Sequence, residues 1–311
     1  MERMRLPAVL IEAFAASACQ GNGAAVVKLR EPLGPQAMQA IAGSLRQSET
    51  AFLLPWQGRW LLRWFTPSCE VKLCGHATLA SLLALGHWGD LEAGASLVFQ
   101  SRSGPLAVSL AADQEDLGAI VLPSSPLAPA APTPELVAEL EQRCGRPVSR
   151  YWTSALGYHV ALLPPGTRLH GLDGLDAQLH GPERGGLVVM AAVDPTAVEF
   201  PLVQGQRADY QLRFFAPGLG IPEDPVTGSA HALVAPWWLE STGKPAVVGW
   251  QPSTHPGGMV CSSASSGMIR LLGTGHLLWD GTLHFEPSSL GDGSVSATSA
   301  RDGWVGLLPR G

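Results

Sequence analysis

The sequence is poor in charged residues. Only 15% of its 311 residues are Asp, Glu, Lys or Arg, against about 25% in an average soluble protein, while 46% are hydrophobic. This balance excludes an intrinsically disordered chain and a coiled coil. Glycine and proline are plentiful, at 36 and 26 residues, which predicts many short elements joined by tight turns.

Two kinds of run are missing. There is no dense stretch of Lys and Arg, and the net charge is −6 at pH 7, so we expect no nucleic-acid partner. Apolar runs such as Leu187–Val193 are far shorter than the roughly 18 residues of a membrane-spanning helix. We therefore expect a soluble protein with no membrane partner.

Cysteine is scarce as well. The five cysteines form an odd, scattered set: Cys19, Cys69, Cys74, Cys144 and Cys261. A chain of this length folds without disulfides, so we interpret them as free thiols and expect a cytoplasmic location. The first residues have the basic start and apolar middle of an export signal, but Glu12 interrupts the apolar stretch and the flanking residues alternate as in a strand. We expect a strand there.

The motifs of several enzyme classes are absent. The chain has no G-x-x-x-x-G-K-[ST], G-x-S-x-G or H-E-x-x-H sequence, and Gly218–Glu223 lacks the third glycine of a dinucleotide fingerprint. Cys69, Cys74 and His76 are of the types that ligate zinc, but their spacing is loose and no fourth ligand is evident. We therefore expect no metal site and no cofactor.

The most informative feature that is present is an internal repeat. Arg63–Pro67 (RWFTP) matches Arg213–Pro217 (RFFAP) at an offset of 150, and Gly75–Ala77 matches Gly228–Ala230 at an offset of 153. An offset near half the chain length predicts two similar halves. A Pro/Ala-rich connector, 122–135, separates them. We expect halves at 1–122 and 135–285, with 286–311 as a strand or tail returning to the first half.

Each half is predicted to contain strands followed by a strand-turn-helix unit. The expected helices are 35–45, 76–85 closed by Gly86, 133–145 capped by Thr133, and 229–238. The expected strands are 8–15, 24–29, 51–55, 59–65 and a series within 259–285 with turns at 266–267 and 280–281. Helices that are apolar on every side must be buried on every side, so we predict an α+β fold in which a sheet surrounds a helix in each half.

In both repeats a glycine stands where a turn enters an apolar helix. The first amides of a helix lack intrahelical acceptors and form an anion site, for which a small carboxylate is a natural ligand. Gly75 and Gly228 are equally well explained as turn residues. His76 also suits a helix cap or a core position, Asp224 before Pro225 suits a turn, and Glu49 on sequence alone is a solvated side chain.

Four segments together resemble the phenazine-biosynthesis PhzF-like family, which shares its fold with diaminopimelate epimerase. They occur in order and are Gln20–Leu29, Ser48–Pro55, Arg63–Ala80 and Arg213–Trp238. The resemblance implies two similar domains, each a curled antiparallel sheet around a central buried helix, with the active site in the cleft between them. It further implies a cofactor-independent isomerase or epimerase that moves a proton on a small amino or hydroxy carboxylic acid. By analogy with relatives it implies a homodimer.

The resemblance also assigns residues. It places the catalytic groups on Glu49, His76 and Asp224, and substrate contacts on Asn22, Gly75, Thr227, Gly228 and Ser229. A carboxyl group can remove and return a proton when burial raises its pKa toward neutrality, which is what we expect of Glu49 in an apolar cleft. Diaminopimelate epimerase uses two cysteines; here Cys74 matches the first, while Pro225 and Val226 stand near the place of the second.

Two features depart from the family pattern. His255-Pro256 stands where an Arg is usual in a Q-x-S-x-R-G-G segment, and Tyr158 follows Gly157 where relatives carry a smaller turn. Two other functions therefore stay open. One is a non-catalytic ligand-binding or protein-interaction member of the fold. The other is a thiol enzyme with Cys74 as nucleophile and His76 as its base.

Overall fold

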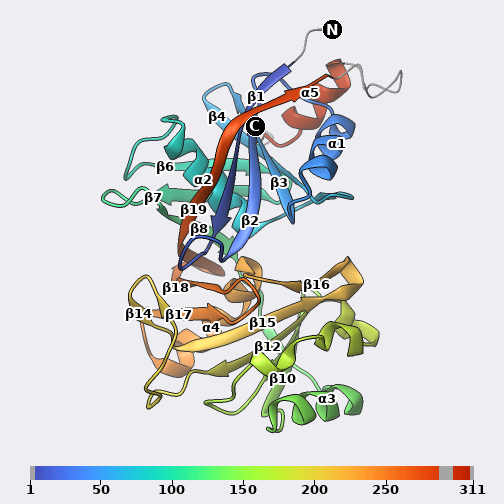
Figure 1. Cartoon of the computed structure of the whole chain (residues 1–311), viewed down its shortest axis with the longest axis vertical. Coiled ribbons are helices and arrows are strands. Elements are labelled where there is room, and N and C mark those ends of the chain that lie inside the picture. The colour runs from blue at the N-terminus through green and yellow to red at the C-terminus, as the bar shows by residue number, and fades with distance from the viewer. Residues whose placement is uncertain (1–3, 287–296, 309–311) are drawn as a thin grey trace. The chain divides into compact units, whose positions relative to one another are not determined.

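A computed structural model describes residues 4–286 and 297–308. The chain divides into two compact units (Figure 1). Unit 1 contains the N-terminal residues up to Ala13, Gly23–Ile120 and the chain from Thr274 onward, and unit 2 contains Phe14–Asn22 and Val121–Gly273. The predicted second half extends to residue 285, but the contacts assign 274–285 to unit 1 because that stretch pairs with the N-terminal strand.

The first part of the chain supplies most of unit 1. Its elements are β1 (Met4–Ala13), β2 (Asn22–Lys28), α1 (Pro35–Leu45), β3 (Glu49–Trp56), β4 (Arg59–Phe65), β5 (Glu70–Val71), α2 (Gly75–His87), β6 (Ser96–Ser101), β7 (Gly104–Leu110) and β8 (Leu117–Pro123). The end of the chain adds β19 (Met268–Phe285) and α5 (Ala297–Val305). Residues 287–296 of the predicted returning tail lie outside the described residues.

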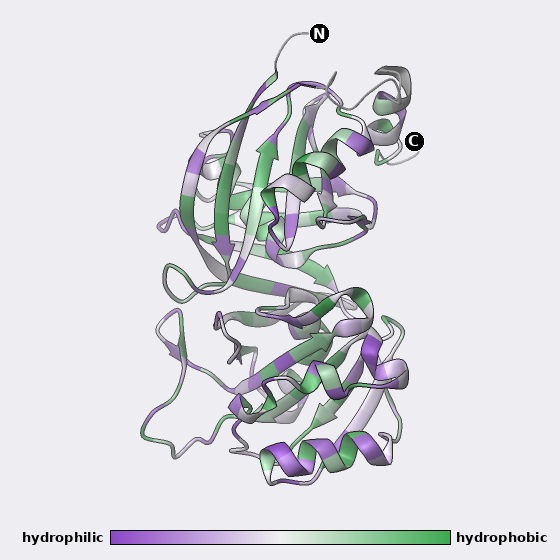
Figure 2. Cartoon of the chain, turned by 45° about the vertical axis from the view of Figure 1, so that its right-hand side comes forward, coloured by the Kyte–Doolittle hydropathy of each residue, from purple (hydrophilic) through white to green (hydrophobic). Residues whose placement is uncertain are grey.

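Unit 2 has a comparable set of elements. Its strands are β9 (Leu127–Pro129), β10 (Arg150–Ser154), β11 (His159–Leu162), β12 (Leu187–Ala192), β13 (Leu202–Val203), β14 (Gln206–Arg207), β15 (Tyr210–Ala216), β16 (Ile221–Asp224), β17 (Ala246–Gln251) and β18 (Gly257–Ser265). Its helices are α3 (Pro134–Cys144) and α4 (Gly228–Thr242), with short 3-10 turns at His170–Leu172, Leu175–Gln178, Gly181–Gly185 and Pro217–Leu219. Figure 2 shows hydrophilic and hydrophobic residues together on α3, whereas the strands are mainly hydrophobic.

In unit 1 the strands form a ring around α2. The pairings run β1–β2, β2–β3, β3–β4, β4–β6, β6–β7, β7–β8, β8–β19 and β19–β1. Every residue of α2 from Gly75 to Leu85 is buried, as its all-apolar sequence predicts. The sheet approaches the helix closely at Gly118, where a Cβ atom would lie 2.8 Å from the Leu82 side chain.

Unit 2 repeats this pairing pattern. β15 is antiparallel to β12 and β16 and parallel to β17, just as β4 is antiparallel to β3 and β5 and parallel to β6. In each unit the helix, α4 or α2, connects the two parallel strands. The sequence repeat therefore corresponds to a repeat in strand order.

The sheets are mixed, which corrects the antiparallel sheets implied by the family resemblance. β2–β3 and β4–β6 in unit 1, and β11–β12 and β15–β17 in unit 2, are parallel. Parallel neighbours need a long crossover connection, and the helices α1, α2 and α4 supply three of these. Alternating sequence patterns identify strands but do not specify their directions, so this feature could not be obtained from periodicity.

A buried ion pair recurs at the same place in both units. Arg63 on β4 forms two hydrogen bonds to Glu70 on β5, at 2.7 and 2.8 Å. Arg213 on β15 forms the equivalent pair with Glu223 on β16, at 2.7 and 2.6 Å. Both guanidinium groups lie over a phenylalanine two residues further on. The bidentate geometry fixes the short β5 and β16 strands ahead of the buried helices.

Two predicted boundaries are wrong. The helix predicted to close at Gly86 continues to His87, and a Cβ atom at Gly86 would lie 3.0 Å from Leu110, so this glycine serves close packing inside the helix. The turn predicted at 280–281 is instead continuous strand, since β1 pairs through Val9 with Asp280 and through Ala8 with Gly281. The predicted helix 35–45, the Thr133 cap and the turn at 266–267 are confirmed.

The C-terminal helix packs on unit 1. Trp304 is fully buried in the cluster that contains Met38 and Phe52, and its indole N–H donates to the Leu33 carbonyl at 2.9 Å. In the part of the chain that the structure describes, no helix has the length and apolar character needed to span a membrane.

Replacing Trp304 by Phe should lower the free energy of unfolding by about 1–3 kcal/mol, because the Leu33 carbonyl loses its buried donor. Trp279→Phe is the control: that ring is 46% exposed, and the change should cost no more than about 0.5 kcal/mol. Urea unfolding followed by circular dichroism measures both. Equal costs would contradict the anchoring role of Trp304.

Candidate functional site

The first predicted residues meet at the N-terminus of α2. Glu49 opens β3 and is 8% exposed, and His76 is the second residue of α2 and is 4% exposed. Their Oε2 and Nε2 atoms are 3.1 Å apart. Glu49 is therefore a buried, paired carboxylate and not the solvated side chain that its local sequence also allowed.

The pair perturbs the ionisation of both groups. Burial opposes the charge of Glu49, but attraction and hydrogen bonding to His76 outweigh it and lower the pKa of the carboxyl group. Burial likewise opposes a charged imidazole, but Cys74 and the Glu49 carboxylate outweigh it and raise the pKa of His76 well above its usual range. The expected rise in the pKa of Glu49 is wrong for this state of the protein, because the apolar surroundings also contain a cationic partner.

Cys74 and Ser48 complete this cluster. The Cys74 sulfur lies 3.5 Å from Nδ1 and 3.7 Å from Nε2 of His76, and the Ser48 hydroxyl lies 3.1 Å from Nε2. Burial and the neighbouring Glu49 charge raise the pKa of Cys74 to about 11, so the thiol is neutral at pH 7. At neutral pH the charge that favours the His76 imidazolium is therefore that of Glu49.

The Glu49–His76 pair should stabilise the protein within a limited pH window. Because the pKa of Glu49 is lowered in the folded protein, the ionised carboxylate adds to the free energy of unfolding above its usual pKa of 4.5. This stabilisation is lost as the pH falls through the lowered pKa. Because the pKa of His76 is raised in the folded protein, the imidazolium adds to the free energy of unfolding, in full below its usual pKa of 6.5. This stabilisation is lost as the pH rises through the raised pKa.

The wild type should therefore exceed a His76→Gln variant in free energy of unfolding most strongly between pH 4.5 and 6.5. Outside this window the difference should shrink by up to about 1.4 kcal/mol per pH unit. Urea unfolding of both proteins across the pH range measures it. A difference that stays constant from acid to alkaline pH would show that the two groups are not an ion pair.

The second predicted residues lie together in unit 2. Asn22 donates from Nδ2 to the Asp224 carboxylate at 2.6 Å and to the Val226 carbonyl at 3.2 Å. The Thr227 hydroxyl donates to the other Asp224 oxygen at 2.7 Å. Asp224 is thus the centre of a polar turn immediately before α4, in agreement with its sequence as an Asp-Pro turn.

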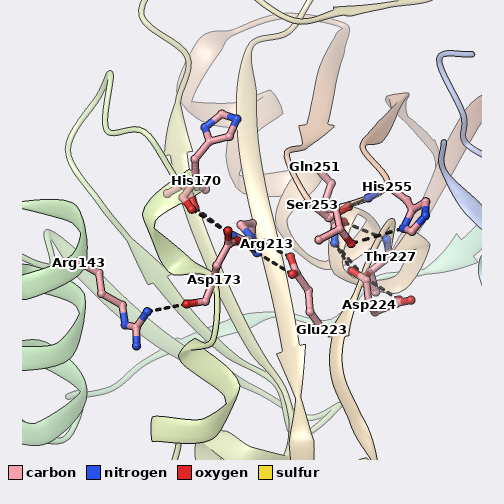
Figure 3. Close-up of polar contacts among 12 residues, drawn as sticks. Arg143, His170, Asp173, Arg213, Glu223, Asp224, Thr227, Gln251, Ser253 and His255 are labelled. Carbon is pink, nitrogen blue, oxygen red and sulfur yellow. Dashed lines mark hydrogen bonds and ion pairs between the residues drawn. The ribbon is translucent and has the colours of Figure 1, made fainter.

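Gln251 holds this turn in place and is a residue that sequence analysis missed. It is fully buried, accepts from the Thr227 amide at 3.0 Å and donates to the Asp224 carbonyl at 2.5 Å (Figure 3). Gln251 begins the segment that resembles the family's Q-x-S-x-R-G-G motif. His255 in the same segment is exposed and contacts Ser253 and Thr254. Figure 3 also shows the Arg213–Glu223 pair on the neighbouring strands.

Both helix starts lack a side-chain cap. Neither α2 nor α4 receives a side-chain hydrogen bond from its N-cap residue, Cys74 or Thr227, so the first-turn amides keep their positive potential. The equivalent of Cys74 in the second repeat is thus Thr227, in agreement with the offset of 153 between the helix starts, and not Pro225 or Val226, near which the comparison with diaminopimelate epimerase placed it. Ser229, in the first turn of α4, lies 3.4 Å from the Tyr158 hydroxyl.

Comparison with known proteins places the chain in a family. The family model for phenazine biosynthesis-like proteins matches residues 11–143 and 189–259. An uncharacterized isomerase of Pseudomonas aeruginosa is 35% identical over 286 residues, which cover 90% of this chain and 100% of that protein. The chain belongs to the phenazine biosynthesis-like protein family. Its curated relatives include a mouse phenazine biosynthesis-like domain-containing protein, 32% identical over 90% of this chain and 99% of its own length.

Solved structures agree with the family assignment. The crystal structure of a PhzF family protein from Enterococcus faecalis matches with a TM-score of 0.74 and 29% identity, covering 91% of this chain and all of that one. A hydroxyproline epimerase from Agrobacterium vitis matches with a TM-score of 0.55 at 13% identity, which shows a shared fold. Two relatives from Pseudomonas aeruginosa, each 35% identical, are named uncharacterized isomerases. The chain is an isomerase with a sheet-rich α+β fold.

Proposed function

We propose that this family member is a cofactor-independent isomerase or epimerase that moves a proton on a small amino or hydroxy carboxylic acid. Glu49 removes the proton and returns it, and His76 is its partner. The observation that carries the proposal is the buried contact of 3.1 Å between these two groups at the N-terminus of α2. A carboxylate and an imidazolium in contact are a base and an acid held within one proton-transfer site.

The charge state of the pair suits this role. Glu49 is ionised before the substrate binds, so it can accept a proton at neutral pH. When a substrate accepts the hydrogen bond that His76 donates to Glu49, Glu49 loses the contact that lowers its pKa. Burial then raises the pKa of its carboxyl group. Binding of the substrate thus strengthens the base, and the His76 N–H stabilises negative charge that develops on the substrate.

A carboxylate on the substrate is supported by the helix starts. The uncapped first-turn amides at Gly75, and those at Gly228 and Ser229, are donors suited to a carboxylate. We assign substrate contacts also to Asn22 and Thr227, and the third catalytic position to Asp224, because their side chains form one hydrogen-bonded group beside the start of α4.

Catalysis by a Cys74 thiolate is less well supported. A nucleophilic cysteine needs a lowered pKa, whereas burial raises the pKa of Cys74 to about 11. The sequence of the second repeat also offers no partner thiol, because Thr227 occupies the equivalent N-cap.

The test is proton exchange with solvent. The protein is incubated with a set of small amino and hydroxy carboxylic acids in deuterated buffer, and each acid is examined by mass spectrometry, with the thermal midpoint of the protein recorded in parallel. We expect at least one acid to gain one deuterium at carbon and to give an isomer or epimer. Exchange in none of the acids would overturn the proposal; acids that raise the thermal midpoint without exchanging would identify a ligand-binding protein.

A further inference from the structure

Three different metal-binding groups converge at the start of α2. Glu49, Cys74 and His76 each offer one ligand atom, an oxygen, a sulfur and a nitrogen, and these atoms all lie within 4.8 Å of one another. All three residues are buried. The sequence prediction considered Cys69 with Cys74 and His76, but Cys69 is exposed and its sulfur contacts the Thr66 hydroxyl, whereas Glu49 reaches the cluster from β3.

The spacing of the three atoms is close to that of a zinc site. His76 Nε2 lies 3.1 Å from Glu49 Oε2 and 3.7 Å from Cys74 Sγ. In a tetrahedral site with zinc bonds of about 2.3 Å to sulfur and 2.0–2.2 Å to nitrogen and oxygen, neighbouring ligand atoms are about 3.4–3.6 Å apart. These two distances differ from the zinc values by a few tenths of an ångström, and the Glu49 oxygen lies within 4.8 Å of the Cys74 sulfur, so side-chain rotations that bring this third pair together would surround the ion.

We propose that Glu49, Cys74 and His76 form a three-ligand binding site for Zn²⁺, with the fourth position left to water or to an anionic ligand. Three protein ligands and an open position are the usual arrangement of zinc sites that exchange a ligand. Thiolate and imidazole ligands bind zinc in preference to magnesium or calcium.

The exchange of charges balances. As zinc ligands, Glu49 is a carboxylate, Cys74 a thiolate and His76 a neutral imidazole, so their two negative charges balance the divalent cation. The proton of the thiol, and that of the imidazole where it is protonated, pass to solvent when Zn²⁺ binds. The buried site therefore takes up the ion without acquiring an unbalanced charge.

Zinc at this site would also stop the isomerase. Under the proposed function Glu49 and His76 transfer the proton, and as metal ligands both would be occupied. This consequence rests on the proposed function, but the binding of zinc does not, so the two can fail separately. Zinc would act here as an inhibitor that competes with the substrate.

Co²⁺ is the probe, because it occupies zinc sites and a cobalt–thiolate bond gives a charge-transfer absorption in the near ultraviolet. We expect one equivalent of Co²⁺ to produce this absorption in the whole protein, and Zn²⁺ to displace it. Cys74→Ser should abolish the cobalt–thiolate absorption. It should also weaken Zn²⁺ binding, measured by calorimetry, by at least about 100-fold, because removal of a residue that only supports a metal ligand already costs up to this much. Cys69→Ser, which changes an exposed cysteine that precedes α2, should retain both the cobalt–thiolate absorption and the affinity for Zn²⁺.

Glu49→Gln and His76→Gln give an independent check that keeps all five thiols. Each should weaken Zn²⁺ binding to the same extent, and each can be compared with the wild type by circular dichroism to confirm folding. Absence of the cobalt–thiolate absorption in the wild type would overturn the proposal. So would an absorption that persists in Cys74→Ser, since the metal would then be held by another cysteine.

Discussion

Replacing Glu49 by Gln should lower the rate of substrate deuterium incorporation by about 10²–10⁴-fold, the range expected for removal of a general acid/base group. Gln has nearly the same shape and still accepts a hydrogen bond from His76 through its amide oxygen. It cannot accept a proton from carbon. The loss should therefore appear in the rate constant for exchange and not in the fold.

The measurement is deuterium incorporation by mass spectrometry, with the acid identified by the exchange screen. Glu115→Gln is the matched control: it makes the same change of charge at an exposed glutamate and should leave the rate unchanged. Circular dichroism verifies that both variants are folded. Exchange by Glu49→Gln at the wild-type rate would show that another group moves the proton, whether or not the protein is an isomerase.

Replacing Arg213 by Met should lower the free energy of unfolding by about 3 kcal/mol, because it leaves the partly buried Glu223 carboxylate without its cation. The guanidinium is almost fully buried, holds Glu223 through two hydrogen bonds and also donates to the Leu169 carbonyl at 3.0 Å. Its further contact with Asp173 is with a side chain that is 78% exposed, and we expect little stability from it.

The double variant Arg213→Met/Glu223→Met separates the two causes. When both charges are replaced by apolar side chains, most of the desolvation cost disappears, so the double variant should be more stable than Arg213→Met alone. Arg63→Met should cost less than Arg213→Met, because Glu70, the partner of Arg63 in unit 1, keeps its ion pair with Arg102. Arg59→Met, at an exposed position, should change stability by no more than about 0.5 kcal/mol. Urea unfolding midpoints that do not separate Arg213→Met from Arg59→Met would refute the structural role of the pair.

These ion pairs show how the repeat works physically. Each apolar helix is buried within a sheet, and the strand that leads into it, β5 or β16, is short. Short strands contribute few ladder hydrogen bonds, and a bidentate arginine supplies two more that are charge-assisted. The repeated Arg-aromatic-Phe sequence was visible as a repeat, but its glutamate partners lie at different spacings, seven residues from Arg63 and ten from Arg213. Alignment by a fixed offset therefore did not identify them.

The spatial arrangement of the candidate residues was predicted in part, and their roles stay predictions. The family motifs pointed to Glu49 and His76, and the structure brings these side chains into contact. Ser48 and Gln251 were missed, because a buried polar side chain has no periodic signal of its own. The nearest sequence signal for these two residues was that each begins a segment that resembles a family motif. The pKa shift of Glu49 was predicted in the wrong direction, because the contact with His76 that lowers this pKa joins residues 27 positions apart in the chain.

The sequence by itself determined the helices α1 to α4, that α2 is buried on all sides, and that the chain repeats itself; it did not predict α5, which lies where a strand or tail was expected. These follow from local composition and periodicity: an all-apolar helix has no face suited to water, wherever it lies. The tertiary structure alone decided the directions of the strands, the passage of β19 through Asp280-Gly281, and the ionisation of Glu49. Each of these depends on a partner that is distant in the sequence. The partners are a parallel neighbouring strand, the β1 ladder and the His76 imidazole. The energy of such a contact is not encoded in the residues that are adjacent in the chain.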